Sequence, residues 1–330
     1  MKKNPLVSVI IVNYNGKKLL ENCFDSISKV TYPDFETILV DNNSDDDSIQ
    51  YVKETFSDTI IIKLDKNYGF AKPNNIGAKK AKGEYLLFLN NDTKVTPNFI
   101  DELVYVMEKN PKIGICQSLL LKPSGEVDSS GDFIDSIGIA YSSQEKFTKV
   151  QEILSAKGAS MIIRKSLFDK LGGFDEKFFL SFEDVDLGWR SWIFGYKVVV
   201  APKSIVYHLG GQTTKDMKNE IAFHGFKNQL AMKFTNFEIG FAIKAITCFF
   251  FIYGFRMLRV SFDYVFKGET KIKATKYEAK LAQKPTLTAI LRGIAWNWKN
   301  VRYLLNKHKI LKENRKFSTK ELMKKMVIVK

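Results

Sequence analysis

The chain has 330 residues, of which 45% are hydrophobic, 26% charged and 13% aromatic. This composition excludes a disordered or low-complexity protein, because such chains lack the apolar surface that offsets the entropy lost on folding. Three cysteines, Cys23, Cys116 and Cys248, are too few and too scattered for a disulfide framework or a zinc site, which indicates a reducing compartment. The N-terminal apolar run has no small-residue cleavage site, so it predicts a first strand rather than a signal peptide.

The net charge of +15 is confined to the last third of the chain. Residues 1–214 contain 26 Lys and Arg against 28 Asp and Glu, a net charge of −2, whereas residues 215–330 contain 25 against 8, a net charge of +17. A basic segment indicates an anionic partner, either a nucleic acid or a membrane surface. Its many aromatic and aliphatic residues favour the membrane, and no helix-turn-helix or RNP-type pattern supports nucleic acid.

Strand and helix patterns alternate along the first 120 residues. Short apolar or β-branched runs predict strands, and apolar residues at helical spacing predict helices. The predicted strands are 7–12, 36–40, 59–63, 84–89, 113–121, 159–164, 197–201 and 204–208, and the predicted helices are 17–28, 44–56 and 73–82. Strands separated by helices predict an α/β fold with a mostly parallel, doubly wound sheet, whose ligands bind at the carboxyl ends of the strands.

The basic C-terminal third predicts amphipathic helices. Residues 241–265 are strongly apolar but include Lys244, Arg256 and Arg259, and the uncharged run 245–255 is 11 residues long. A spanning helix needs roughly 20 residues, so this segment favours an interfacial or re-entrant helix, with a helix packed in the core as the alternative. A second helix is predicted over 286–305, with Leu291, Ile294, Trp298, Val301 and Leu305 on one face.

Polar clusters follow three of the predicted strands. They are Asn13-Tyr14-Asn15, Asp41-Asn42-Asn43 and Asn90-Asn91-Asp92. Each alone is explained by the polarity of loops, but three at the same edge of a sheet favour a site. A carboxylate at Asp92 is able to hold a divalent cation that bridges two phosphates of a nucleotide, and a turn cap is the alternative.

A second cluster lies at Phe182-Glu183-Asp184-Val185-Asp186-Leu187-Gly188-Trp189-Arg190. Three acids in four positions among aromatic residues are costly to bury unless they have partners or a role. Glu183 and Asp184 are candidates for a general base, while Asp186 and Arg190 have the i, i+4 spacing of a helical ion pair. His208 ends a predicted strand, and from its position alone a structural role and a ligand role both remain open.

At these motifs the chain resembles the family 2 glycosyltransferases, in the branch that includes rhamnosyltransferases and galactofuranosyltransferases. The resemblance covers roughly residues 5–235. It is carried by VSVIIVNYNG (7–16), ILVDNNSD (38–45), NYGFAKPNNIG (67–77), YLLFLNNDT (85–93), GGFD (172–175) and FEDVDLGWR (182–190). It implies a GT-A fold and an inverting sugar transfer from a nucleoside-diphosphate sugar, assisted by Mn²⁺ or Mg²⁺.

The resemblance also assigns roles to individual residues. It places Asn13, Asn15 and Asp41 at nucleoside-binding positions, Asn67, Gly69 and Asn75 on the loop and helix that close over the nucleotide, and Asn90-Asn91-Asp92 on the DxD motif. Because Asn90 replaces the first acid, Asp92 is the expected metal ligand and Asn91 is grouped with the nucleotide-binding residues. Asp184 matches the general base, and His208 matches a histidine that completes the metal site.

The expected function is transfer of a sugar from a UDP- or dTDP-sugar to a hydroxyl of a lipid-linked or cell-surface glycan precursor, as in cell-wall or polysaccharide biosynthesis. The QxxRW pattern of processive synthases is missing from the sequence, which favours the addition of one or a few sugars. The segment 124–148 is predicted as an acceptor-side loop. The alternatives are a sugar-nucleotide-binding scaffold without activity, which Asn90 makes conceivable, and a nucleic-acid-binding protein.

We expect residues 1–236 to form the catalytic domain, and residues 237–330 to form a helical, basic, membrane-associating region. The protein is then expected to be cytoplasmic and peripherally associated with the inner face of the cell membrane. Its anionic partner is the membrane surface rather than nucleic acid.

Overall fold

The computed structural model describes residues 4–210, 218–267 and 286–326, with the side chains of 256–267 left out of the description. Two compact units are present, residues 1–132 with 142–216, and residues 133–141 with 217–330. The predicted division after residue 236 stays a prediction.

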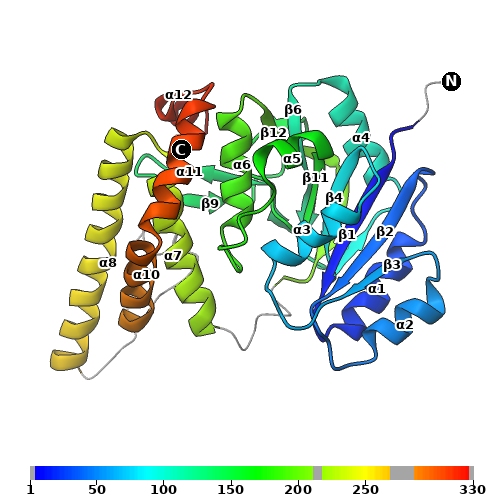
Figure 1. Cartoon of the computed structure of the whole chain (residues 1–330), viewed down its shortest axis with the longest axis horizontal. Helices are drawn as coiled ribbons and strands as arrows, with labels where there is room; N and C mark the ends of the chain where they lie inside the picture. Colours follow the sequence, from blue (N-terminus) through cyan, green and yellow to red (C-terminus); the bar gives the residue numbers. More distant parts are fainter. Residues whose placement is uncertain (1–3, 211–217, 268–285, 327–330) are drawn as a thin grey trace. The chain divides into compact units, whose positions relative to one another are not determined.

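The first unit is built on a ten-stranded mixed sheet (Figure 1). Its main path runs β10-β12-β6-β11-β4-β1-β2-β3, with β5 paired to β12 and β7 paired to β6. The strands are β1 (Val7–Asn13), β2 (Phe35–Asp41), β3 (Ile60–Lys63), β4 (Tyr85–Asn90), β5 (Thr93–Val95), β6 (Ile113–Leu121), β7 (Val127–Ser129), β10 (Gln151–Glu152), β11 (Ser160–Arg164) and β12 (Lys197–His208). The expected α/β fold with a parallel-rich sheet is confirmed, because β3, β2, β1 and β4 are parallel and β6 is parallel to β12.

Both faces of this sheet are covered by helices, as two-sided burial of the strands requires. The helices are α1 (Lys17–Ile27), α2 (Ser48–Thr55), α3 (Ala71–Lys80), α4 (Phe99–Lys109), α5 (Lys165–Leu171) and α6 (Glu183–Ile193). Val9 and Leu87 belong to the core that includes α1 and α4. Their strand neighbours Ile10 and Phe88 face the other way, where Ile10 meets Gly77 of α3 and Phe88 meets Phe168 of α5. Alternate strand residues therefore serve opposite faces.

Several predicted boundaries differ from the structure. The helix expected over 73–82 is α3, which lies two residues earlier at each end and has Pro73 in its first turn. The helix expected from residue 44 begins at Ser48, because Ser44 is bound to Asp41 and Asp46 accepts the backbone N–H of Ser48. The two strands expected at 197–201 and 204–208 are one strand, β12, with an irregularity after Ala201 that accommodates Pro202. The helix expected over 286–305 is two helices that meet at Asn300.

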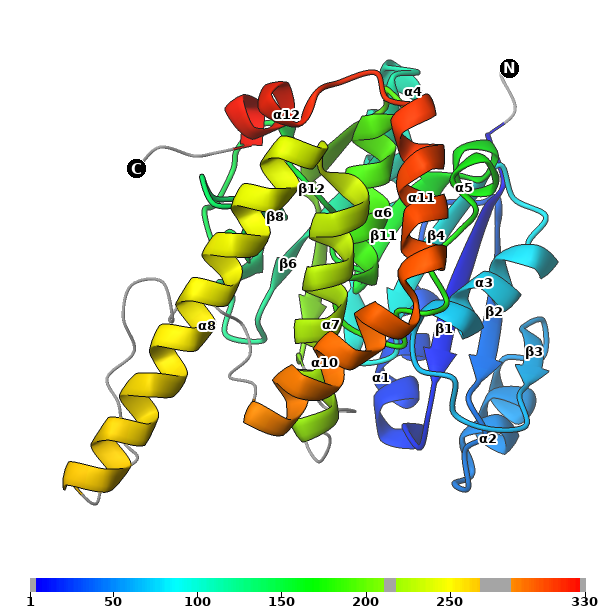
Figure 2. The same cartoon turned by 60° about the vertical axis from the view of Figure 1, so that its left-hand side comes forward.

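The second unit is helical. Its helices are α7 (Lys218–Asn236), α8 (Ile239–Lys267), α10 (Leu287–Lys299), α11 (Val301–Glu313) and α12 (Thr319–Met326), and α8, α10 and α11 contact α7 (Figure 2). Phe226 of α7 packs against Phe249 and Tyr253 of α8, with ring centroids 5.1 and 5.2 Å apart. Buried Lys233 donates to the carbonyl of Gly138 at 2.6 Å, which ties α7 to the loop before β9 (Ala140–Ser142), the partner strand of β8 (Asp132–Ile134).

Within the described residues, none of the helices has the length and apolar character to cross a membrane.

Candidate functional site

The carboxyl ends of β1, β2 and β4 hold a buried polar network. Asn13 and Asp41 are partners in the parallel register of β1 and β2, and Asn13 Nδ2 donates to Asp41 Oδ1 at 3.2 Å. Asn91 Nδ2 donates to Asn13 Oδ1 at 2.8 Å, which links the end of β4 to the same network. Ser44 donates to both oxygens of Asp41, through its backbone N–H at 2.8 Å and its hydroxyl at 2.6 Å. These bonds satisfy the buried carboxylate and fix the edge of the sheet.

Asn15 lies in the loop after β1 and binds the loop that follows β2. It lies in the left-handed region at φ +48°, which asparagine tolerates better than most residues. Its backbone N–H donates to the Ser44 hydroxyl at 2.9 Å, and its Oδ1 accepts the backbone N–H of Asp45 at 2.8 Å. Asn15 therefore joins the loops after β1 and β2 into one rim.

A second loop, at residues 67–70, lies against Asn42. Asn67 Oδ1 accepts the N–H of Gly69 at 2.8 Å, and Asn42 Nδ2 donates to the Gly69 carbonyl at 2.7 Å. Gly69 has φ +76°, and a Cβ there would lie 2.2 Å from the carbonyl oxygen of Phe179. Only glycine fits this turn. Asn42 holds the loop in place and was not among the predicted site residues.

The side chain of Asn75 is used elsewhere. Its Nδ2 donates to the carbonyl of Phe174 at 2.9 Å, and its Oδ1 accepts the backbone N–H of the same residue at 2.9 Å. Both ends of the amide are thus bound to the 172–176 loop. Asn75 is 7% exposed, and in this structure its amide fastens α3 to the chain that leads into α6.

Asp92, His208 and Asp128 contact one another in series. Asp92 follows β4, His208 ends β12 and Asp128 lies in β7. His208 Nε2 lies 3.4 Å from Asp92 Oδ1, and its Nδ1 lies 2.8 Å from Asp128 Oδ2. Burial alone would lower the pKa of His208, but the hydrogen bonds with Asp128 and Asp92 outweigh it and raise the pKa to about 9. Asp128 comes from β7, 80 residues before His208 in the sequence, within the segment predicted as an acceptor-side loop.

The Asp92–His208 pair provides two of the ligands that a divalent cation requires. Asp92 Oδ1 and His208 Nε2 are both buried, and in the described part of the chain neither has a polar partner besides the other, at 3.4 Å. Carboxylate oxygen and imidazole nitrogen suit Mn²⁺. No group of three or more His, Cys, Asp and Glu among the described residues is arranged to hold a metal ion. A cation held by Asp92 and His208 would need its remaining ligands from a substrate or from water.

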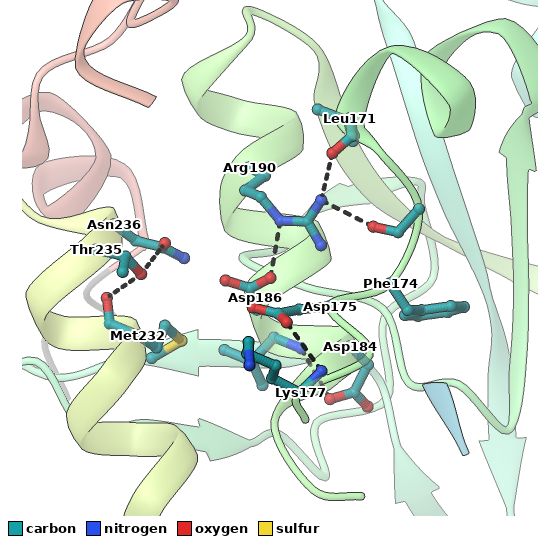
Figure 3. A network of polar contacts seen from close by, with 12 residues as sticks. Leu171, Phe174, Asp175, Lys177, Asp184, Asp186, Arg190, Met232, Thr235 and Asn236 are labelled. Atoms are coloured by element: carbon teal, nitrogen blue, oxygen red, sulfur yellow. Dashed lines mark hydrogen bonds and ion pairs between the residues drawn. The ribbon is translucent and has the colours of Figure 1, made fainter. Parts of the chain in front are cut away.

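Helix α6 has Glu183 and Asp184 in its first turn, where the helix dipole stabilises acidic side chains. Figure 3 shows Asp184 together with Asp186 and Arg190 of the same helix. The two residues that precede α6, Ser181 and Phe182, have positive φ values of 68° and 69°. Such backbone costs about 1–3 kcal/mol for each residue and persists only where the surrounding structure holds it. The predicted Asp186–Arg190 pair is confirmed at 2.8 Å, and Arg190 Nη1 also donates to the carbonyls of Leu171 and Gly173.

Asp184 lies in a charged environment. Its Oδ1 accepts the Val185 N–H at 2.8 Å, and its Oδ2 accepts the Gly158 N–H at 3.3 Å. Burial raises the pKa of Asp184, and the charge of Lys157 opposes the rise. Burial and the charge of Asp184 also raise the pKa of Glu183. Lys157 Nζ pairs with Asp132 Oδ1 at 2.8 Å.

A cavity of about 360 Å³ brings these groups together. Its walls include Asn90, Asp128, Lys157, Glu183, Asp184 and His208. The predicted base and the predicted metal-site histidine thus face one pocket. Asp92 instead lines a second cavity of about 500 Å³ and reaches the first through its contact with His208. Asp128 and Lys157 were not predicted, since no local pattern marks either residue.

Comparison with known proteins identifies the class. The sequence profile of Glycosyl transferase family 2 matches residues 8–172, half of the chain. The chain belongs to this family. The O-antigen biosynthesis protein RfbC of Myxococcus xanthus is 34% identical over 227 residues, which cover 63% of this chain and 18% of RfbC. This chain therefore spans about a fifth of that relative's length.

Two further similarities complete the comparison. An N-acetylglucosaminyl-diphospho-decaprenol L-rhamnosyltransferase of Mycobacterium tuberculosis is 24% identical over 249 residues, which cover 66% of this chain and 81% of that enzyme. Among solved structures, GalNAc-T7 with UDP, GalNAc and Mn²⁺ matches with a TM-score of 0.58 at 20% identity, over 71% of this chain and 48% of that chain. The last similarity establishes the GT-A fold.

Proposed function

We propose that this chain transfers a sugar from a nucleoside-diphosphate sugar to an acceptor hydroxyl with inversion at the anomeric carbon. The observation that carries the proposal is the shared pocket, in which Asp184 on α6 and His208 at the end of β12 face the same cavity of about 360 Å³. That cavity lies beside the ends of the parallel strands, where ligands of open α/β sheets bind.

Asp184 is the proposed general base. In an inverting transfer the acceptor oxygen attacks the anomeric carbon from the face opposite the diphosphate. The C–O bond forms while the bond to the diphosphate breaks, and Asp184 takes the hydroxyl proton. The Val185 and Gly158 N–H groups hold the carboxylate in place, and no covalent nucleophile is required.

Asp92 and His208 are the proposed ligands of Mn²⁺ or Mg²⁺. Such a cation neutralises negative charge that develops on the leaving diphosphate. Asp128 orients the imidazole through Nδ1, so that Nε2 faces Asp92. The presence of Mn²⁺ in the GalNAc-T7 structure supports the choice of a divalent cation.

The donor is proposed to be a UDP- or dTDP-sugar. Its nucleoside is assigned to the edge formed by Asn13, Asn15 and Asp41, and its diphosphate to the neighbourhood of Asn91 and the Asn67–Gly69 turn. The polar side chains at this edge already bind one another, which supports a preformed cradle whose outer atoms meet the donor. Asn75 is proposed to act by holding α3 against the 172–176 loop.

The acceptor is proposed to be a lipid-linked or cell-surface glycan precursor, reached at the cytoplasmic face of the cell membrane. The names of two relatives, an O-antigen biosynthesis protein and a diphospho-decaprenol rhamnosyltransferase, support this choice. The net charge of +17 over residues 215–330 supports peripheral contact with an anionic membrane rather than with nucleic acid.

The test is a panel of UDP-, dTDP- and GDP-sugars incubated with the full chain and Mn²⁺, with release of nucleoside diphosphate as the readout. At least one donor is expected to be turned over, and the Asp184→Asn variant is expected to release far less from the same donor. A panel in which the chain and Asp184→Asn release nucleotide equally would contradict the proposal.

A further inference from the structure

Helices α10 and α11 together expose a continuous apolar stripe. Its members follow one another at intervals of four or three residues, so within each helix they lie on one face. They are Leu287, Leu291, Ile294, Trp298, Val301 and Leu305, hereafter the α10–α11 stripe. Exposed fractions rise from 37% for Ile294 and Val301 to 81% for Trp298, far more than a tryptophan side chain usually shows.

The other face of the same helices is fixed against α7, which holds the stripe outward. A Cβ on Gly293 would lie 2.6 Å from the ring of Phe226, and Asn297 Nδ2 donates to the carbonyl of Lys227 at 3.1 Å. Leu304 of α11 is 3% exposed. Because α10 and α11 already pack on α7 with their small and buried residues, rotation that would hide the stripe would break these contacts.

The positive charge beside the stripe favours an anionic partner. Residues 286–312 contain six basic residues and no acidic one, namely Arg292, Lys299, Arg302, Lys307, Lys309 and Lys312. Arg292 is paired with Glu220 at 3.0 Å. A second copy of the chain docked on this face would place like charges opposite each other, whereas an anionic bilayer offers both the opposite charge and an apolar interior.

We propose that the α10–α11 stripe is a docking surface for an anionic lipid bilayer, with Trp298 at the level of the headgroups. Aromatic rings favour that level, and the flanking cations meet the lipid phosphates. The inference rests on the proposed membrane-side function, but its test uses no sugar transfer, so the two can fail separately.

The test is sedimentation of the full chain with vesicles of phosphatidylcholine alone or mixed equally with phosphatidylglycerol. The full chain is expected to pellet with the anionic vesicles and to be partly released by high salt, because surface charges are screened. Ile294→Gln/Trp298→Gln/Leu305→Gln removes the apolar contact. Lys299→Glu/Arg302→Glu/Lys309→Glu removes the charge attraction, worth about fivefold in affinity for each cation, so binding is expected to fall at least about a hundredfold.

The matched control reverses three exposed lysines of the other unit, as Lys53→Glu/Lys80→Glu/Lys112→Glu, at the same change in net charge. It is expected to keep most of its binding. A thermal melt of each variant verifies folding, and the changes are at exposed positions, where effects on stability are small.

Tryptophan quenching by brominated lipid places the stripe in the bilayer. Trp189 and Trp192 are buried and Trp296 is half-buried, whereas Trp298 is 81% exposed, so quenching on anionic vesicles is expected to come mainly from Trp298. It is expected to fall sharply in Trp298→Phe while sedimentation persists. Equal pelleting of the two stripe variants and the control overturns the proposal. So does a change from dimer to monomer in the stripe variants with lipid binding intact, which would assign the face to a second copy.

Discussion

Lys157 supplies positive charge to a pocket otherwise rich in carboxylates. It pairs with Asp132 of β8 and faces Asp184 and Glu183 of α6, while Asp186 of the same helix adds to the field. Asp128 and His208 line the same cavity. Burial alone would lower the pKa of Lys157, but the carboxylates of Asp132, Asp184 and Glu183 outweigh it and raise the pKa above its usual value. Lys157 therefore stays charged and favours the ionised form of Asp184.

Removing that charge is expected to change the pH dependence of transfer. Burial holds the pKa of Asp184 above its usual value and Lys157 opposes the rise, so Lys157→Met raises the pKa further. A base works only when deprotonated, so activity is lost as the pH falls through its pKa. The acidic limb of the kcat/KM profile is thus expected to move to higher pH in Lys157→Met and to return towards wild type in Lys157→Arg.

The control for this pair is Lys165→Met, which removes a half-buried lysine paired with Asp169 and is expected to leave the profile unchanged. If the acidic limb of the kcat/KM profile stays at the same pH in Lys157→Met and only the maximum of kcat/KM falls, Lys157 has a structural role and does not tune Asp184.

The metal assignment predicts a graded loss of cation-dependent nucleotide binding. Asp92→Ala removes a charged ligand and is expected to lose most of the difference in nucleotide affinity between Mn²⁺ and EDTA. His208→Ala is expected to lose less. Asp128→Asn leaves both ligands but weakens the orientation of His208, for which about a 10- to 100-fold loss in metal affinity is expected. Calorimetric titration of nucleotide with and without Mn²⁺ measures all three, and indifference of binding to Mn²⁺ in the unaltered chain would end the assignment.

At the scale of elements, the placement of α6 depends on a close approach at Gly188. A Cβ at this position would lie 2.5 Å from the Ser155 Cβ, 2.6 Å from its Cα and 2.8 Å from the Leu154 carbonyl oxygen. Two of these atoms belong to the backbone and move only with the chain. The helix that carries Asp184 is therefore fixed against the segment that follows β10.

Gly188→Ala is expected to destabilise the fold by about 1–3 kcal/mol, the usual cost of overpacking, and to reduce transfer by displacing Asp184. The matched control is Gly254→Ala in α8, where a Cβ meets nothing within 4 Å, so helix propensity makes the change neutral or slightly stabilising. Urea unfolding of both variants measures the difference. Equal stability of the two variants would mean that the close approach costs nothing.

Periodicity predicted most elements because strands and helices differ in the spacing of their apolar residues. The strands at the positions of β1, β2, β4 and β6 are confirmed within one residue or so of their ends. The antiparallel insertion of β11 between β4 and β6 was not predicted, since a buried strand reads the same in either direction. The break at Asn300 was missed because the apolar stripe runs through it without a change of phase.

Some residues of the candidate site were predicted from the sequence and others were not. Asp184 was predicted from a local acidic motif and His208 from the family resemblance, and the structure places both on one cavity. Asp128 and Lys157 reach that cavity through a hairpin and a loop that no local pattern marks, so geometry alone identifies them. Asn75 illustrates the reverse, because its motif is evident while its amide is bound to Phe174.

At the scale of the whole molecule, the chain combines a family 2 glycosyltransferase unit with a basic helical unit. The first contains the pocket with Asp184, and the second contains the α10–α11 stripe. Catalysis and membrane docking are thus assigned to different residues, which allows each to be removed without the other. Loss of lipid binding in the stripe variants is expected to leave transfer to a water-soluble acceptor analogue unchanged.

The measurement that tests the central claim most directly is the rate of transfer by Asp184→Asn at saturating donor, with donor affinity measured in parallel. A general base lowers the barrier and contributes little to donor binding, so the rate is expected to fall about 10²- to 10⁴-fold while donor affinity stays within a few fold of wild type. Turnover close to that of the unaltered chain would contradict the account, because the proton would then leave by way of another group.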